Sequence, residues 1–158
     1  MNETQRTRLR NAGFVTFFFS GICAISSGVV VSLLQEQYGF AYGMTGTLLS
    51  LMSIGNLLAG FLMAVLPGKL GMKPSALLLT AGYAVGYGLM GLVSGGGWAL
   101  AFFLVGLAKG SVINVCTILV SDNSADRTRG MNLMHSCYAM GALLCPFLIA
   151  AAAQVSLG

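Results

Sequence analysis

The run "WALAFFLVGLAKGSVINVCTILV", residues 98–120, decides the fold. It is apolar for most of its length, and a run of roughly 18 or more such residues predicts a membrane-spanning helix. Lys109 lies at its centre, about 16 Å from either end at a helical rise of 1.5 Å per residue. A lysine at that depth costs on the order of 2.5–3.5 kcal/mol. It therefore needs a water-filled cavity, a partner, or the loss of its proton.

Four further segments share this apolar character. The chain has 158 residues, of which 56% are hydrophobic and only 8% are charged, whereas soluble domains carry about 25% charged residues. We therefore predict an all-α polytopic membrane protein, with residues 1–12 as an N-terminal tail and 13–158 as part of a transmembrane domain. The five expected helices cover residues 13–34, 43–66, 75–94, 98–120 and 131–155.

The basic residues set the expected orientation. Seven of the eight fall in three segments that alternating helices place on one side of the membrane, and the other side carries Glu36 without Lys or Arg. The positive-inside rule then predicts a cytoplasmic N-terminus, in a bacterial-type inner membrane. Topology accounts for the net charge of +4, so the lipid bilayer is an expected partner and nucleic acid is not. The seven residues are Arg6, Arg8, Arg10, Lys69, Lys73, Arg127 and Arg129.

An internal repeat runs through the chain. "IGNLLAGFLMA" (54–64) and "MGALLCPFLIA" (140–150) are identical at six of eleven positions, at an offset of 86 residues. A weaker match relates 17–30 to 102–115 at an offset of 85. The implied unit has three helices, so the second copy enters the membrane from the opposite side, as in the inverted repeats of secondary transporters. We expect an incomplete 3+3 repeat, with a sixth helix near residues 160–180 supplied by missing C-terminal helices or by a partner chain.

The loop "AVLPGKLGMKPSALLL" (64–79) resembles the signature loop of the major facilitator superfamily, G-x-x-x-D-R-x-G-R-K. Lys69, Gly71 and Lys73 match it, whereas the family's Asp falls on Gly68. The resemblance implies the N-terminal domain of a transporter in which two six-helix bundles rock about a central site. A short basic turn after a helix is the simpler interpretation of the same residues.

A second stretch, "RGMNLMHSCYAMGALLCPFLIA" (129–150), resembles the fifth helix of the sugar-transporting branch that includes the fucose permeases. This resemblance implies transport of a small polar solute, a sugar or a sugar-like metabolite, without a cofactor. The helix also resembles, less closely, that of the drug antiporters, several of whose glycines are replaced here by Cys145, Ile149 and Ala150. The residues that match the sugar branch are Asn132, His135, Tyr138, Gly141, Ala142 and Pro146.

Four polar residues within the apolar segments are candidates for the wall of a substrate cavity. Lys109 and Asn56 lie at mid-depth, where transporter sites are found, and Asn114 and His135 lie in neighbouring parts of their helices. Lys109 could attract an anionic group or donate hydrogen bonds to hydroxyls. Alternatively, Lys109 is paired with an acid or a carbonyl, the asparagines join helices, and His135 is an interface residue.

Other classes of protein remain open at this level. The spacings Gly82-x-x-x-Gly86 and Gly106-x-x-x-Gly110 place small residues on one helix face, which suits close helix packing and allows a small non-transporting assembly protein. Drug efflux is a further alternative, although Lys109 in a cavity would repel lipophilic cations. The predicted helices hold no carboxylate at mid-depth to carry a coupling proton, and we find neither a catalytic constellation nor metal-ligand spacing.

Overall fold

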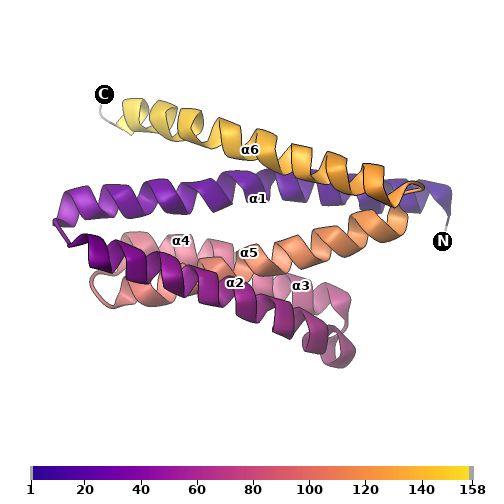
Figure 1. The fold of residues 1–158 in the computed structure, drawn as a ribbon, viewed down its shortest axis with the longest axis horizontal. Helices are drawn as coiled ribbons and strands as arrows, with labels where there is room; N and C mark the ends of the chain where they lie inside the picture. Colours follow the sequence, from indigo (N-terminus) through magenta and orange to yellow (C-terminus); the bar gives the residue numbers. More distant parts are fainter. Residues whose placement is uncertain (1, 157–158) are drawn as a thin grey trace. The chain divides into compact units, whose positions relative to one another are not determined.

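The computed structural model describes residues 2–156, with side chains as far as residue 152. Within these residues, five helices or helix pairs are long and apolar enough to cross a membrane, which confirms the five predicted spans. The third span, Met72–Leu92, consists of two helices. The described elements are α1 (Glu3–Tyr38), α2 (Tyr42–Leu70), α3 (Met72–Thr80), α4 (Gly82–Leu92), α5 (Gly97–Asn123) and α6 (Arg127–Ser156), shown in Figure 1.

The helices differ from the predicted segments in two ways. Their ends extend beyond the apolar runs, so that α1 already begins at Glu3, because hydropathy detects only the part suited to lipid and polar residues also adopt helix. The third segment, expected as one helix over 75–94, is divided at Ala81, which keeps helical backbone angles (φ −57°, ψ −21°) and hydrogen bonds to Leu77 and Val85, so the interruption is a slight one. Gly82, the next residue, lies where an added Cβ would be 2.6 Å from the carbonyl oxygen of Leu104 on α5. The interruption therefore coincides with a close helix approach.

The chain divides into two compact units. The first comprises residues 1–29 and 115–158, and the second comprises residues 30–114. Helices α1 and α5 contribute to both, so each unit contains parts of helices that are distant in sequence. The contacts below are described within one unit at a time.

In the second unit, α5 provides the centre. Its residues Ala101, Phe102 and Val105 are completely buried, in a core that includes Leu48 of α2 and Met90 of α4. Helix α4 approaches α5 through Gly82 and Gly86, where a side chain would meet the backbone or side chains of residues 101, 104, 105 and 108. This glycine pair therefore serves packing inside the chain.

Close glycine contacts also reveal the internal repeat. In the first unit, Gly141 of α6 lies against the backbone carbonyl of Phe18 on α1. In the second unit, Gly55 of α2 lies against the carbonyl of Phe103 on α5. The two glycines are 86 residues apart and the two phenylalanines 85 apart, which are the offsets of the sequence repeat. The two copies thus use equivalent atoms to pack their helices.

Each crossing also has a second glycine contact, made by the other helix, and these contacts follow the same offsets. Gly21 of α1 lies against the carbonyl of Tyr138 on α6, and Gly106 of α5 lies against that of Met52 on α2. Residue 21 corresponds to 106, and residue 52 to 138. Each helix crossing is therefore formed by two glycines, one from each of the two helices. The contacts at both crossings are evidence for the repeat that does not depend on sequence identity.

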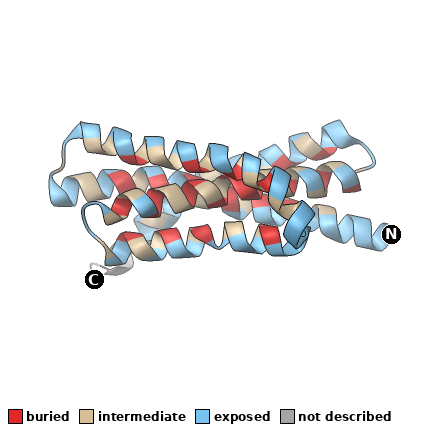
Figure 2. Cartoon of the chain, turned by 90° about the horizontal axis from the view of Figure 1, so that it is seen from below, coloured by how far each residue is buried: buried red, intermediate tan, exposed pale blue. Residues whose placement is uncertain are grey.

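The outer faces of α2 and α6 repeat as well. Leu57 and Leu143 are 64% and 69% exposed, and Phe61 and Phe147 are 66% and 67% exposed. Figure 2 shows such exposed positions alternating along the helices with buried ones. Large apolar side chains without protein contacts are appropriate where the surroundings are lipid. Sequence offset, glycine contacts and exposure thus agree on one repeated unit.

Candidate functional site

Lys109 lies on α5, the helix that provides the centre of the second unit. The repeat pairs α5 with α1, whose buried residues include Phe17 and Ala24. Lys109 is the counterpart of Ala24 at the offset of 85 residues, and it is half-buried. One copy of the repeat thus carries a methyl group at this position and the other a charged side chain. Packing of the repeat alone does not require the lysine.

The ammonium group of Lys109 has no ion pair and no hydrogen bond within residues 2–152. The hypothesis that Lys109 is paired with an acid or a carbonyl therefore finds no partner in the part of the chain that the structure describes. A charged group without a partner is expensive in a membrane and marks a functional position by default. The structure leaves this amine available to a ligand.

Asn56 lies against Gly110, the residue after Lys109, at the crossing of α2 and α5. A Cβ added to Gly110, the neighbour of Lys109, would be 2.9 Å from Asn56 Oδ1 and 2.5 Å from its backbone oxygen. The Oδ1 atom is buried and accepts no hydrogen bond from the described residues. A buried amide oxygen without a donor costs on the order of 1–3 kcal/mol. The structure thus brings an unpaired donor-bearing residue and an unpaired acceptor to one level of the second unit.

Asn114 and His135 have different surroundings. Asn114, half-buried on α5, donates from Nδ2 to the carbonyl of Gly110 at 2.8 Å, so one arm of its amide is bound to its own helix. His135 belongs to the first unit and is exposed. Its ring meets the ring of Phe17 edge-on, with centroids 5.5 Å apart. Of the expected four, Asn56 and Lys109 thus lie at one helix crossing of the second unit, whereas His135 lies in the first unit against Phe17.

The predicted signature loop is a single residue between two helices. Helix α2 ends at Leu70 and α3 begins at Met72, with Gly71 between them at φ 88° and ψ 158°. Its carbonyl accepts a hydrogen bond from the Ser75 hydroxyl at 2.7 Å, and its N–H donates to the Pro67 carbonyl at 3.0 Å. Lys69 and Lys73 flank the turn and are exposed. The loop therefore presents two cations on a fixed, glycine-dependent turn.

The backbone of Gly71 leads to a test of the turn. Positive φ with extended ψ is a region that essentially only glycine occupies, and other residues there cost of order 1–3 kcal/mol. We expect Gly71→Ala to lower the free energy of unfolding by about that amount. Gly68→Ala, in helical backbone with open space at its Cα, is the control. Unfolding of both variants in detergent with increasing SDS measures the difference, and equal stability of the two would contradict the expectation.

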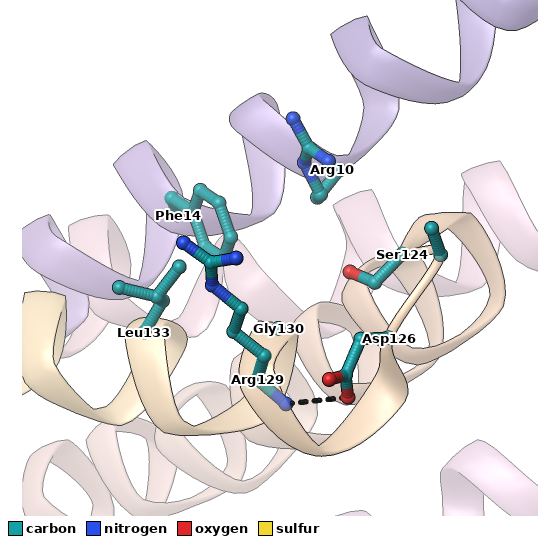
Figure 3. A pocket seen from close by; sticks show the side chains of 8 residues that line it. Arg10, Phe14, Ser124, Asp126, Arg129, Gly130 and Leu133 are labelled. Carbon is teal, nitrogen blue, oxygen red and sulfur yellow. Dashed lines mark hydrogen bonds between the residues drawn. The ribbon is translucent and has the colours of Figure 1, made fainter.

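A second group of polar residues, which we did not predict as a site, lies at the basic end of the first unit. A hollow of about 310 Å³ is lined by Arg10 of α1, Arg129 of α6, and the turn residues Ser124 and Asp126. Figure 3 shows Arg129 extending toward Phe14 on α1, while Asp126 accepts a hydrogen bond from the Arg129 backbone at 3.0 Å. Sequence reasoning used these arginines only for topology. Arg10 of α1 and Arg129 of α6 line the same hollow beside the turn that joins α5 to α6.

Comparison with known proteins agrees with this architecture. The family model described as Major Facilitator Superfamily matches residues 12–158. Proteins named "Protein TsgA homolog" from Yersinia pestis (strain Pestoides F) and from Yersinia pseudotuberculosis (serotype O:1b, strain IP 31758, and serotype O:3, strain YPIII) are each 26% identical to the chain over 159 aligned positions. The match covers 95% of this chain but 39% of each relative, so the chain spans about two fifths of their length.

No solved structure matches the chain significantly. The family assignment therefore rests on the sequence model, with which the five spans and the repeated glycine crossings agree. Since the matched region includes nearly every described residue, this chain is an integral membrane protein that belongs to the major facilitator superfamily.

Proposed function

We propose that the chain takes part in transport of a small polar solute, a sugar or a sugar-like metabolite, by alternating access, as the N-terminal part of a secondary transporter. Membership of the superfamily supports transport as the class of activity. We further propose that its N-terminus is cytoplasmic in a bacterial-type inner membrane, as the distribution of arginine and lysine favours, and that further helices of the transporter complete the cavity wall.

The observation that carries this proposal is the pair formed by Lys109 and Asn56. The lysine offers three N–H donors, and the Asn56 Oδ1 is a buried acceptor without a donor. A hydroxylated solute supplies acceptors for the lysine, and the Asn56 amide at the same helix crossing is the proposed second contact. A hydrocarbon-like solute would leave both unpaired.

The two alternatives fit the structure less well. Assembly through glycine-rich faces needs those faces to be available, yet the pairs Gly82/Gly86 and Gly106/Gly110 lie against neighbouring helices of the same chain. A third pair at this spacing, Gly91 and Gly95, has open space at its Cβ positions. Export of lipophilic cations would bring a positive charge toward Lys109, whose own charge has no carboxylate beside it among the described residues. Charge repulsion at low dielectric is costly, so a neutral or anionic solute is favoured.

A ligand screen on the purified protein tests the proposed solute class. A bound solute raises the free energy of unfolding by RT ln(1 + [L]/Kd), about 2.7 kcal/mol at one hundred times Kd. We expect neutral monosaccharides or sugar acids to raise the unfolding temperature, and tetraphenylphosphonium to leave it unchanged. A shift with tetraphenylphosphonium and none with any sugar would favour drug efflux and contradict the proposal.

A further inference from the structure

The hollow at the basic end of the first unit gathers buried polar atoms that have no partner. Among the described residues, five buried side-chain atoms lack a hydrogen bond, and three of them belong to Arg10, Asn123 and Ser124. Arg10 and Ser124 line the hollow of about 310 Å³ introduced above, and Arg10 and Asn123 line a neighbouring one. Buried polar groups are normally paired, so a cluster of exceptions beside a cavity points to a bound group.

The charged residues that line the hollow indicate the charge of the ligand that it would bind. Arg10 and Arg129 enter it from two different helices, and neither guanidinium forms an ion pair with a carboxylate in the described part of the chain. Asp126 also lines the hollow, and its Oδ1 accepts the Arg129 backbone N–H at 3.0 Å, so one carboxylate faces two guanidinium groups there. The Ser124 hydroxyl is a third donor without a partner. Two guanidinium groups and a hydroxyl suit an oxyanion, because arginine binds phosphate oxygens in a bidentate manner.

The neighbouring hollow combines arginines with hydrogen-bond acceptors. Glu3 and the Oδ1 atom of Asn123 contribute acceptors there, beside Arg6 and Arg10. Each hollow contains one carboxylate, Asp126 in the first and Glu3 in the second. We place the oxyanion in the first because its unpaired hydroxyl, Ser124, can donate, whereas the unpaired Asn123 Oδ1 of the second can only accept. The two hollows share Arg10 and Ala125.

The position along the helices agrees with a ligand at the membrane surface. Arg10 and Arg129 both lie just before the predicted apolar segments of their helices, 13–34 and 131–155. This is the level of the lipid head groups, and basic pockets between helices at that level bind anionic head groups. We propose that Arg10, Arg129 and Ser124 form a binding site for a phosphate group, carried either by an anionic phospholipid or by free phosphate.

Thermal unfolding of the purified full chain in detergent measures this binding directly. Short-chain phosphatidylglycerol, the matching phosphatidylcholine and inorganic phosphate are titrated separately, and exposure of the buried thiols of Cys116 and Cys145 to a reactive fluorophore reports unfolding. We expect phosphatidylglycerol to stabilise the wild-type protein more than phosphatidylcholine does. Arg10→Gln combined with Arg129→Gln should weaken its affinity by about tenfold or more, since charge-assisted hydrogen bonds are lost.

Matched variants distinguish a specific binding site from general electrostatic attraction between exposed arginines and an anionic ligand. Arg8→Gln and Arg127→Gln remove exposed arginines from the same helices α1 and α6, and neither residue lines the hollow. They should leave the affinity nearly unchanged. Ser124→Ala should weaken binding severalfold, and Arg129→Lys should weaken it despite keeping the charge, because lysine lacks the guanidinium fork. These two single changes decide the matter if the double variant does not fold.

The results distinguish the sources of the phosphate. Tight binding of phosphatidylglycerol with weak binding of inorganic phosphate supports the site with lipid as its occupant. Equal affinity of inorganic phosphate, with the same sensitivity to Arg129→Lys, supports the site with free phosphate. Unchanged affinity in both Ser124→Ala and Arg129→Lys, or an equal loss in Arg8→Gln, would overturn the proposal.

Discussion

Adding one methyl group at Gly55 or at Gly106 is expected to lower the free energy of unfolding by about 1–3 kcal/mol or more. At Gly106 the new Cβ would overlap the backbone of Met52, and at Gly55 it would overlap the carbonyl of Phe103. Backbone atoms cannot change rotamer, so the two helices must separate. In a membrane, association depends largely on such close packing, and separation would weaken the whole α2·α5 crossing.

The same helix supplies the control. Gly60 lies five residues after Gly55 on α2, and no heavy atom lies within 4 Å of the position that its Cβ would take. Gly60→Ala should leave stability unchanged or raise it slightly, because alanine has the higher helix propensity. SDS-induced unfolding in mixed micelles compares the two alanine variants. Similar stability of Gly55→Ala and Gly60→Ala would show that the crossing is not closely packed.

The repeat extends this expectation to the first unit. Gly21 and Gly141 form the equivalent crossing of α1 and α6, so Gly21→Ala should cost as much as Gly106→Ala, its counterpart. Combining Gly55→Ala with Gly106→Ala should cost less than the sum of the two, because both relieve their overlap by the same separation of helices. Gly21→Ala and Gly106→Ala act in different units and should be more nearly additive.

Much of this fold could be predicted from the sequence because lipid imposes simple rules. Helix length, apolar composition and the repeat at offsets of 85 and 86 follow from what a membrane tolerates. The interruption at Ala81 could not be predicted in this way. It lies in an apolar segment, and it is adjacent to the close approach of Gly82 to α5, which only the tertiary structure reveals.

The candidate site shows a similar division. Lys109 was recognisable because a charge at mid-depth is rare, and Asn56 because it lies at a similar depth. The approach of Asn56 to α5 depends on Gly110, the residue after Lys109, whose missing side chain leaves room for the Asn56 amide. The group of Arg10, Ser124 and Arg129 was not recognised, since arginines at helix ends are normally explained by topology. What distinguishes them is a cavity and missing partners, and neither can be read from spacing.

On the proposed function, replacing Lys109 by methionine in the full-length transporter is expected to abolish most solute uptake while leaving the protein at least as stable as before. The ammonium group has no partner in the described structure, so its removal breaks no ion pair or hydrogen bond there. It also eliminates a charge that costs on the order of 2.5–3.5 kcal/mol at the bilayer centre. Loss of a hydrogen bond from a charged group to the solute, worth about 1.5–3 kcal/mol, corresponds to a tenfold or greater decrease in solute affinity.

Lower uptake together with unchanged or higher stability would distinguish a solute-binding Lys109 from one that supports the fold. A lysine that supports the fold through a partner would lower stability when removed, because the partner would be left buried and unpaired. A lysine that binds solute lowers uptake alone, which is the usual conflict between function and stability at a site. Lys109→Arg should retain part of the uptake, since the charge and the donors remain even though the geometry changes.

A neighbouring residue provides the matched control. Ser111 lies on α5 two residues after Lys109, is completely buried, and donates its hydroxyl to the Leu107 carbonyl of its own helix at 2.8 Å. Ser111→Ala should therefore leave uptake near the wild-type level. Uptake of the solute identified by the ligand screen, together with SDS unfolding of the same variants, measures both quantities. Wild-type uptake in Lys109→Met would exclude the lysine from the site. Reduced stability together with reduced uptake would assign the lysine to the fold, because only a ligand contact predicts that uptake falls while stability does not.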